Sequence, residues 1–522
     1  MTYKLGPFLG INHKRADFDL RVRTNSVQGD YLRDALNVDI DNGGNLRRRL
    51  APSLVQVLSG AHSLHLLDGG SGLLVRDAVL YRVTLPAYSE VLVKTLSSDA
   101  RMSYQAAGDS LYFSNGTDSG RVLGSTAYPW ALPRPAAPGL SSVGGSLPAG
   151  LYQVVVSYYN SGTGEEGGVS PSAQVVVVAD SGVRVSLPGA TTGATHVRVY
   201  LSGTNGAVPQ LAATVAPGGV ADILTVPSGA DAPTRREMPL PAGELLLSSG
   251  RLCSFSGNTL YLGHPHKFGY CDPLASFIPF PAPISVAVDA QTGIFVAADK
   301  TYWVPNDGQV VDVFPYGAVP GTAFSLPDKA VYGWFGAKGL VLASPSGEAQ
   351  TLMDSVEVTP PVSGMTALIT DGFDRAVSCG WCVNLDTKAV TRYDGWDFTS
   401  FSSGYGTRDD GIYALDSSDT VAWSADFGKV DLGDNQEKHL PNAYLGVQSS
   451  DIMLLNVQAP GKFGGDYTYP TRGYSAELNV QRIDVGKGLR ANWFNLALSG
   501  ETGSDFILAD IEFVAATTKR RI

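Results

Sequence analysis

Short runs of alternating apolar and polar residues, separated by Gly- or Asp-containing turns, recur along most of the chain. A period of two places successive side chains on opposite faces of a strand, so each run predicts a half-buried β-strand. The stretch "ISVAVDAQTGIFVAADKTYWV" (284–304) holds two such runs around a turn that contains Gln291, Thr292 and Gly293, which predicts a hairpin. Similar turn-and-strand units begin at Gly108, Gly257, Lys338 and Asp410.

The glycine and proline content supports a protein made of many short strands. The 60 glycines and 31 prolines are spread along the chain without a collagen-like period. Irregularly spaced hairpins are typical of the four-stranded sheets of a β-propeller, although the spacing does not match a WD or kelch repeat. A run of separate sandwich domains would use the same hairpins and is the alternative. We predict an all-β fold with a β-propeller-like main domain.

Two Pro-rich segments, "YPWALPRPAAPG" (128–139) and "APTRREMPLPAGE" (232–244), interrupt this pattern. Between them, short alternating strands recur about every ten residues, which is the spacing of a small Ig-like or fibronectin-like β-sandwich. The expected organisation is the first part of the propeller at 1–134, an inserted Ig-like sandwich at 135–240, the rest of the propeller at 241–440, and C-terminal strands at 441–522 that close the propeller or form a small sheet.

Composition narrows the classes of function. Of the 522 residues, 44% are hydrophobic and only 17% charged, and the formal net charge is −11. An acidic chain does not suit a protein that wraps DNA by neutralising phosphates, although it allows a local basic patch. No apolar run approaches the roughly 20 residues that span a bilayer, and the first residues lack a signal-peptide pattern. We expect a protein made in the cytoplasm, with free thiols at Cys253, Cys271, Cys379 and Cys382.

Three stretches have the residue types of a metal or redox site, but each lacks part of the required pattern. Cys379 and Cys382 have redox-pair spacing, yet their flanks alternate like a strand and no second pair is near for zinc. His264 and His266 lack a convincing third ligand, and "DIDNGG" (39–44) lacks the closing Glu of a calcium loop. Because no Gly-x-Ser-x-Gly elbow, Walker loop or paired-carboxylate signature is present, we expect no enzyme activity, cofactor or metal.

The stretch "GDYLRDALNVDIDNGGNLRRR" ends in three consecutive arginines. On a strand, Arg47 and Arg49 would point to one face and Arg48 to the other. Three guanidinium groups cannot all be buried without partners, so they must meet water, carboxylates or phosphates. Asp39 and Asp41, on the preceding strand, are the expected ion-pair partners across the hairpin. A subunit interface and direct contact with DNA are the alternatives.

Several stretches together resemble structural proteins of tailed bacteriophages, namely "GINHKRADFDLR", "GDYLRDALNVDIDNGGNLRRR", "LYLGHPHKFGYCD", "GIFVAADKTYWV" and the terminal "DFILADIEFVAATTKRRI". The closest likeness is to the propeller-built tail nozzle, or packaged-DNA stabilisation, proteins of short-tailed phages. This resemblance implies a sixfold ring below the portal and adaptor that closes the channel until DNA is ejected. It also implies an Ig-like insert on the outside, and it brings no catalytic, metal or nucleotide-binding residues.

The resulting expectation is a virion structural protein that forms the distal conduit of a phage tail, retains packaged DNA and opens for genome ejection. The expected partners are copies of itself in a homo-hexameric ring, the adaptor, tail fibre or spike proteins, the host surface, and double-stranded DNA that passes without sequence-specific binding. The alternative is a receptor- or glycan-binding tail component, because 23 tyrosines and 7 tryptophans on a β scaffold could stack on sugars.

Overall fold

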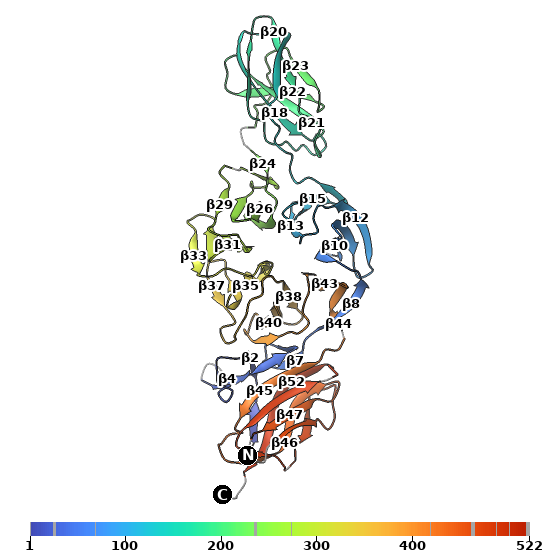
Figure 1. Ribbon diagram of the computed structural model, residues 1–522, viewed down its shortest axis with the longest axis vertical. Helices are drawn as coiled ribbons and strands as arrows, with labels where there is room; N and C mark the ends of the chain where they lie inside the picture. The colour runs from blue at the N-terminus through green and yellow to red at the C-terminus, as the bar shows by residue number, and fades with distance from the viewer. Residues whose placement is uncertain are drawn as a thin grey trace.

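The computed structural model describes residues 2–517 except 25–27, 68, 234–236, 273, 418, 461–464, 487 and 501. The described secondary structure is almost entirely β-strand, with one 3-10 turn, η1 (Pro327–Lys329). Three β modules follow one another along the long axis in Figure 1: an inserted sandwich, a propeller, and a second sandwich at the end where both termini lie. We call this second sandwich the terminal sandwich. No helix in the described residues is long and apolar enough to cross a membrane.

The propeller has seven blades of four antiparallel strands within the described residues. Blade 1 consists of β9 (His62–Leu66), β10 (Ser71–Arg76), β11 (Val79–Thr84) and β12 (Ser89–Thr95). Blade 2 consists of β13 (Ser103–Ala107), β14 (Ser110–Ser114), β15 (Ser119–Leu123) and β16 (Thr126–Tyr128). Blade 3 consists of β25 (Glu244–Ser248), β26 (Arg251–Ser256), β27 (Thr259–Leu262) and β29 (Phe277–Pro279). Blade 4 consists of β30 (Val286–Asp289), β31 (Gly293–Ala297), β32 (Thr301–Pro305) and β33 (Val311–Phe314). Blade 5 consists of β34 (Phe324–Leu326), β35 (Val331–Gly336), β36 (Gly339–Ala343) and β37 (Ala349–Thr351).

The last two blades link the propeller to the rest of the chain. Blade 6 consists of β38 (Thr366–Thr370), β39 (Asp374–Ser378), β40 (Trp381–Asn384) and β41 (Val390–Arg392). Blade 7 consists of β42 (Ser400–Ser402), β43 (Tyr405–Arg408), β44 (Gly411–Ser417) and, as its outer strand, β8 (Ala51–Val57). Because β8 comes from the N-terminal side of the chain and pairs antiparallel with β44, the two ends of the propeller segment are joined in one sheet.

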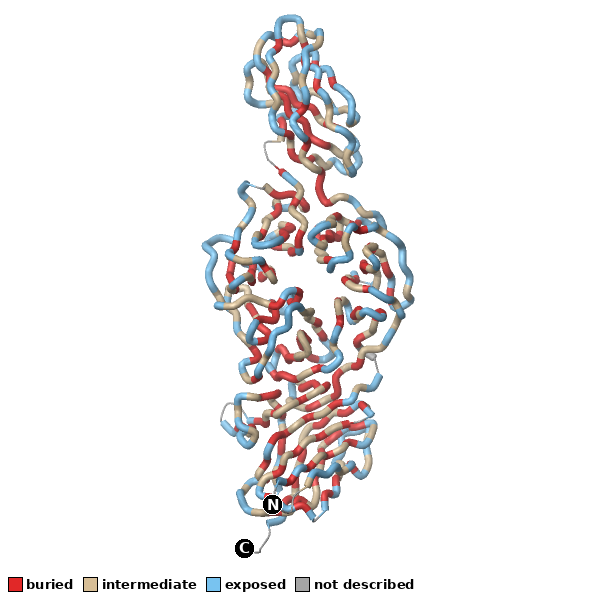
Figure 2. Tube along the Cα trace, viewed as in Figure 1, coloured by how far each residue is buried: buried red, intermediate tan, exposed pale blue. Residues whose placement is uncertain are grey.

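The predicted hairpin at 284–304 is confirmed. It is formed by β30 and β31, and Gln291 in its turn has a φ of 68°. All five residues of β31 are buried, which is the burial expected of a strand in the middle of a blade. Figure 2 shows the same trend around the ring, where buried segments lie within the blades and exposed segments lie mainly at the rim.

The inserted sandwich lies between blades 2 and 3. One sheet holds β17 (Gly139–Leu147), β20 (Ser181–Ser186) and β23 (Val220–Ile223), and the other holds β19 (Ala173–Val177), β18 (Gly150–Tyr159), β21 (His196–Ser202) and β22 (Pro209–Val215). Alternate residues of facing strands, among them Tyr152, Val154, Val183 and Val199, form its own buried core. Below the insert, β24 (Met238–Pro239) pairs with β28 (Tyr270–Cys271).

Glu165 of the insert binds the propeller, and the adjacent Glu166 binds a strand of the insert itself. The carboxylate of Glu165 accepts hydrogen bonds from Nη2 of Arg121 in blade 2, at 2.8 Å, and from the hydroxyl of Tyr270 on β28, at 2.7 Å. The carboxylate of Glu166 turns the other way and binds Nη1 of Arg198, on β21 of the insert, at 2.6 Å. Neighbouring side chains therefore bind opposite modules, which couples the position of the insert to that of blades 2 and 3.

Strands from both ends of the chain build the terminal sandwich. One sheet contains β49 (Asn479–Asp484), β46 (Lys438–Ser449), β52 (Phe506–Thr517), β7 (Leu46–Arg48) and β6 (Val38–Ile40), with β1 (Thr2–Leu5) paired to β52 and β50 (Arg490–Ala491) paired to β46. The other contains β5 (Asp34–Leu36), β45 (Trp423–Val430), β51 (Phe494–Gly500), β47 (Leu454–Ala459) and β48 (Gly465–Pro470), and it continues through β5 into blade 6. A small sheet, β2 (Phe8–Ile11), β4 (Gln28–Leu32) and β3 (Arg21–Arg23), lies alongside.

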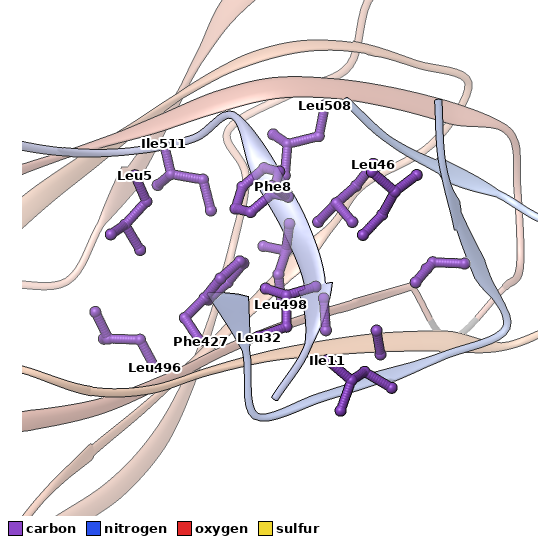
Figure 3. Close-up of a cluster of buried hydrophobic side chains, with 14 of the residues drawn as sticks. Leu5, Phe8, Ile11, Leu32, Leu46, Phe427, Leu496, Leu498, Leu508 and Ile511 are labelled. Carbon is purple, nitrogen blue, oxygen red and sulfur yellow. The ribbon is translucent and has the colours of Figure 1, made fainter. Parts of the chain in front are cut away.

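The core of the terminal sandwich mixes residues from the two ends of the sequence. Figure 3 shows Leu5, Phe8 and Leu32 packed with Phe427, Leu498 and Ile511. Burying such side chains stabilises the fold by roughly 1.5–3 kcal/mol each. Folding of this module therefore requires the N-terminal segment to reach strands that lie close to the opposite end of the sequence.

The module boundaries differ from the expected ones at both ends of the chain. The segment before β8, expected in the propeller, contributes β1 to β7 to the terminal sandwich and its neighbouring sheet, and the propeller begins only at β8. Residues 441–522 do not close the propeller, because β8 does. They form most of the terminal sandwich instead, together with β45 and the start of β46 from the expected 241–440 segment. The physical reason is that β1 and β52 pair with each other and share one apolar core.

Candidate functional site: an arginine cluster between the propeller and the terminal sandwich

The three consecutive arginines lie where the terminal sandwich meets blade 6. β6 and β7 form a hairpin in which Asp39 is opposite Arg47, and β7 also pairs with β52. Asp41 closes the turn of the hairpin, because its Oδ1 accepts hydrogen bonds from the backbone N–H groups of Gly43, at 2.9 Å, and Asn45, at 3.0 Å. This is the turn-stabilising role that aspartate commonly has.

Asp39 is buried and binds blade 6 rather than the arginines of its own hairpin. Its Oδ2 lies 3.1 Å from Nε of Arg375 on β39, and both side chains are only 2% exposed. Its Oδ1 accepts hydrogen bonds from the hydroxyl of Tyr393 and, at 3.5 Å, from Sγ of Cys382. Burial raises the pKa of Asp39, and the Arg375 guanidinium and the Tyr393 hydrogen bond oppose that rise.

Arg375 links this buried carboxylate to the surface. Burial disfavours its charge, but the Asp39 carboxylate, together with Tyr393, Asp371 and Cys382, offsets that effect, and the pKa of Arg375 is raised. Its other nitrogens bind both carboxylate oxygens of the half-exposed Asp371, with Nη2 and Oδ2 3.1 Å apart. The guanidinium also lies 4.4 Å from the centre of the Phe373 ring, within the range of a cation–π contact. Arg375 is thus held on three sides.

Arg48 and Arg49 have separate sets of partners. Arg48 is 8% exposed; its Nε lies 2.7 Å from Oδ1 of Asp505, and its Nη1 donates to the carbonyl of Asp419 at 2.7 Å. Arg49 is 3% exposed, and its Nε donates to Oδ1 of Asn37 at 2.8 Å. The Arg49 guanidinium also lies 4.9 Å from the centre of the Tyr393 ring. Each buried guanidinium therefore has polar partners, as burial of a charge requires.

Arg47 is the least constrained of the three arginines. It is half-buried and its guanidinium lies 5.7 Å from the centre of the Phe373 ring, and no ion pair to it occurs among the described residues. A cavity of about 440 Å³ opens beside it. The charged side chains that line this cavity are three arginines and three aspartates, namely Arg47, Arg48, Arg375, Asp39, Asp371 and Asp505. Their formal charges cancel, so the cavity is not a strongly cationic pocket of the kind that attracts phosphate.

The predicted site residues are only partly brought together. Asp39 and the three arginines converge on this junction, whereas Asp41 serves the hairpin turn. The predicted ion pairs across the hairpin are wrong, because none joins either aspartate to Arg47, Arg48 or Arg49 within the described residues. The register of the β6–β7 hairpin determines which backbone positions are opposite each other, but not which charged groups the side chains contact. The buried Asp39 carboxylate instead faces a guanidinium brought by a remote strand.

Sequence reasoning missed three residues of this junction: Arg375, Tyr393 and Asp505. One signal for Arg375 was available, because it begins the largely apolar stretch "RAVSCGWCV". A charged residue within a strand that is buried on both faces needs a buried partner of opposite charge. No local pattern indicates that this partner is Asp39, which lies in the N-terminal hairpin, far from Arg375 along the chain.

The cysteine and histidine motifs considered as metal or redox sites lie in turns and strands of the fold. Cys379 and Gly380, with φ of 54° and 78°, form the two-residue turn between β39 and β40, and Cys382 donates to Asp39. All four cysteines are free. His266 lies in a turn with a φ of 56°. Within the ranges that the structure describes, no group of three or more His, Cys, Asp or Glu side chains is arranged to hold a metal ion.

No protein-family model matches the chain, and no curated protein matches it. Among solved structures, it is similar to the extracellular domain of a protein described as a one-component system from B. thetaiotaomicron (10% identity, TM-score 0.21) and to a puromycin-hydrolysing peptidase of Mycobacterium tuberculosis (11%, TM-score 0.27). These matches cover 91% and 72% of the chain, which spans only 63% and 62% of the length of those proteins. An exo-β-1,3-galactanase from Phanerochaete chrysosporium matches at 12% identity, over 89% of this chain and all of that one, with a TM-score of 0.18. Likenesses this loose carry no argument about activity.

Proposed function

We propose that this chain is a structural protein of a bacteriophage tail. Together with further copies of itself, it would form the distal conduit that retains packaged DNA and opens for genome ejection. The proposal starts from the resemblance of several stretches at both ends of the sequence to propeller-built tail nozzle proteins. Its mechanism needs no catalytic residue, because gating of a conduit is a change in the conformation of loops.

The observation that carries the proposal is how the chain uses its three consecutive arginines. Arg48 and Arg49 are buried and bind partners within the chain, and the charges around the adjoining cavity are balanced. A conduit through which DNA must slide should not bind phosphates tightly, since every neutralised phosphate adds to the affinity. A basic run that fastens two modules, within a chain of net charge −11, fits that requirement.

The hub of the propeller is a poor path for DNA. Arg101 precedes the inner strand of blade 2, and Gly321 precedes that of blade 5, on the far side of a seven-bladed ring. A Cβ atom added to Gly321 would lie 2.0 Å from Nη1 of Arg101, so this guanidinium reaches across the hub. We therefore place the proposed DNA lumen between copies of the chain, with each propeller forming part of its wall.

A receptor-binding tail component is the second candidate, favoured by one feature of the insert. Its edge strand β19 and the residue after it expose Val176 and Val178, which are 68% and 63% accessible. Exposed apolar side chains on an edge strand at the far end of an elongated molecule suit contact with a partner.

The test is the behaviour of the purified chain in solution. Native mass spectrometry should find a closed ring of six copies, and duplex DNA should not bind measurably at physiological salt. A strictly monomeric chain that binds duplex DNA with a steep salt dependence would contradict the proposal. A monomer that binds no DNA but binds a host glycan through the insert would favour the second candidate.

A further inference from the structure

A second cavity lies among the inner strands of blades 2 to 5, at the end where the β30–β31 turn is found. It has a volume of about 350 Å³, and its apolar wall includes Leu245 and Leu247 from β25 and Phe324 from β34. Its polar lining side chains are Gln105, Asp289, Gln291, Ser325 and Tyr332, of which Asp289 is the only charged one. A cavity that combines an apolar wall with convergent polar groups can hold a small molecule that has both an apolar and a polar part.

Asp289 ends β30 and presents an oxygen that has no partner. Its Oδ2 accepts a hydrogen bond from the backbone N–H of Gln291 at 3.3 Å, whereas its buried Oδ1 has no hydrogen-bond partner. No ion pair reaches Asp289 from the described residues. Burial raises the pKa of this carboxyl group, and the Ser248 hydroxyl opposes the rise. A partly buried carboxylate without an ion pair is destabilising, and a cation beside it would lower that cost.

Tyr332 supplies the second unpartnered oxygen of the same cavity. Its side chain is 1% exposed, and its buried hydroxyl has no hydrogen-bond partner among the described residues. Burial is the main cause that raises the pKa of Tyr332, and the negative charge of Asp289 is the second cause. The phenol therefore lies within electrostatic reach of the carboxylate. Buried polar atoms are nearly always satisfied by protein, water or ligand. Both unpartnered oxygens belong to residues that line one cavity, so a group bound there can serve both.

We propose that this cavity binds a primary alkylammonium group. The ammonium donates to Oδ1 of Asp289 and to the Tyr332 hydroxyl oxygen, and its methylene groups lie against the leucines of β25. An ammonium suits the site because it carries three donors and a positive charge on an apolar stem. This chemistry has two sources, a free aliphatic amine or the lysine side chain of a neighbouring copy. The inference does not depend on the proposed tail function.

The experiment is isothermal titration of the full-length chain with n-butylamine, with n-butanol as the neutral probe of the same length. Saturable binding of the amine, with none of the alcohol, is expected. Asp289→Asn keeps the shape of the side chain but removes its charge, and should weaken binding about tenfold or more. Asp307→Asn, which changes an exposed aspartate of the same blade, is the matched control and should leave binding unchanged.

Two further measurements keep the proposal falsifiable. If Asp289→Asn does not fold, Leu247→Phe narrows the cavity from its apolar wall and must abolish binding. Native mass spectrometry separates the two sources: a free amine leaves the mass of the protein assembly unchanged, whereas displacement of a neighbour's lysine dissociates it. The proposal is overturned if butylamine does not bind saturably, since water alone would then fill the cavity. It is also overturned if butylamine binds the wild type and Asp289→Asn equally, since the Asp289 charge would then play no part in binding.

Discussion

Asp39 and Arg375 form a buried ion pair, with Oδ2 of the aspartate 3.1 Å from Nε of the arginine, across the junction of the terminal sandwich and blade 6. One partner comes from the N-terminal hairpin and the other from a blade strand in the second half of the sequence. The pair therefore joins two modules that do not share a continuous stretch of sequence. Pairs of this kind favour one arrangement of modules, because loss of either partner leaves the other charged and buried.

Removing the arginine alone should destabilise this junction strongly. Arg375→Met leaves Asp39 without its cation, and we expect the free energy of unfolding to fall by about 3–5 kcal/mol. The measurement is urea denaturation followed by tryptophan fluorescence. Asp39→Asn combined with Arg375→Met removes both charges and should recover much of the loss. A double variant no more stable than Arg375→Met would show that the cost comes from lost packing instead.

Arg48 should contribute more to the stability of the fold than Arg47 does. Arg48→Ala removes a buried guanidinium that bonds the Asp419 carbonyl and the exposed Asp505, and should cost about 1–3 kcal/mol of stability. Arg47→Ala removes only a cation–π contact and should cost at most about 1 kcal/mol. Thermal unfolding of the two variants side by side makes the comparison. Equal losses would mean that charge density, not the individual partners, stabilises the hairpin.

The sequence predicts local features well and the junction poorly, and the reason is distance along the chain. The hairpin at 284–304 follows from alternation and turn residues that lie within one short segment. The ion pair of Asp39 with Arg375 does not follow from any local pattern, because the pairing of β5 with blade 6 brings the two residues together. The outer strand of blade 7 is another such case, since nothing local to β8 indicates that it pairs with β44.

The position of the insert should depend on Glu165. Glu165→Ala removes the bonds to Arg121 and Tyr270, and we expect the insert to move more freely relative to blades 2 and 3. Small-angle scattering should then show a broader distribution of maximum dimensions, with an unchanged circular dichroism spectrum. Glu348→Ala, in an exposed turn of blade 5, is the control. An unchanged distribution for Glu165→Ala would indicate that the backbone linkers alone hold the insert.

Stability should fall in mild acid, partly because of His65. This half-buried imidazole stacks on Tyr104, with ring centres 5.2 Å apart, and burial lowers its pKa below the ordinary 6.5. The unfolded chain therefore binds the proton on His65 more tightly than the folded chain does. The neutral imidazole makes its full contribution to the free energy of unfolding above pH 6.5, and this contribution is lost as the pH falls below that value. His65→Phe should reduce the drop in Tm between about pH 7.5 and 5.5, whereas Tyr104→Phe should not. A drop of unchanged size in His65→Phe would assign the acid sensitivity to other groups.

The central claim, a tail conduit that retains DNA, is tested most directly by electron microscopy of phage particles that carry a nonsense mutation in this gene, with retained DNA measured on the same preparation. The account predicts truncated tails and heads that are empty or leak DNA. Full heads with complete tails that only fail to adsorb to the host would contradict it and would instead assign the chain to receptor binding.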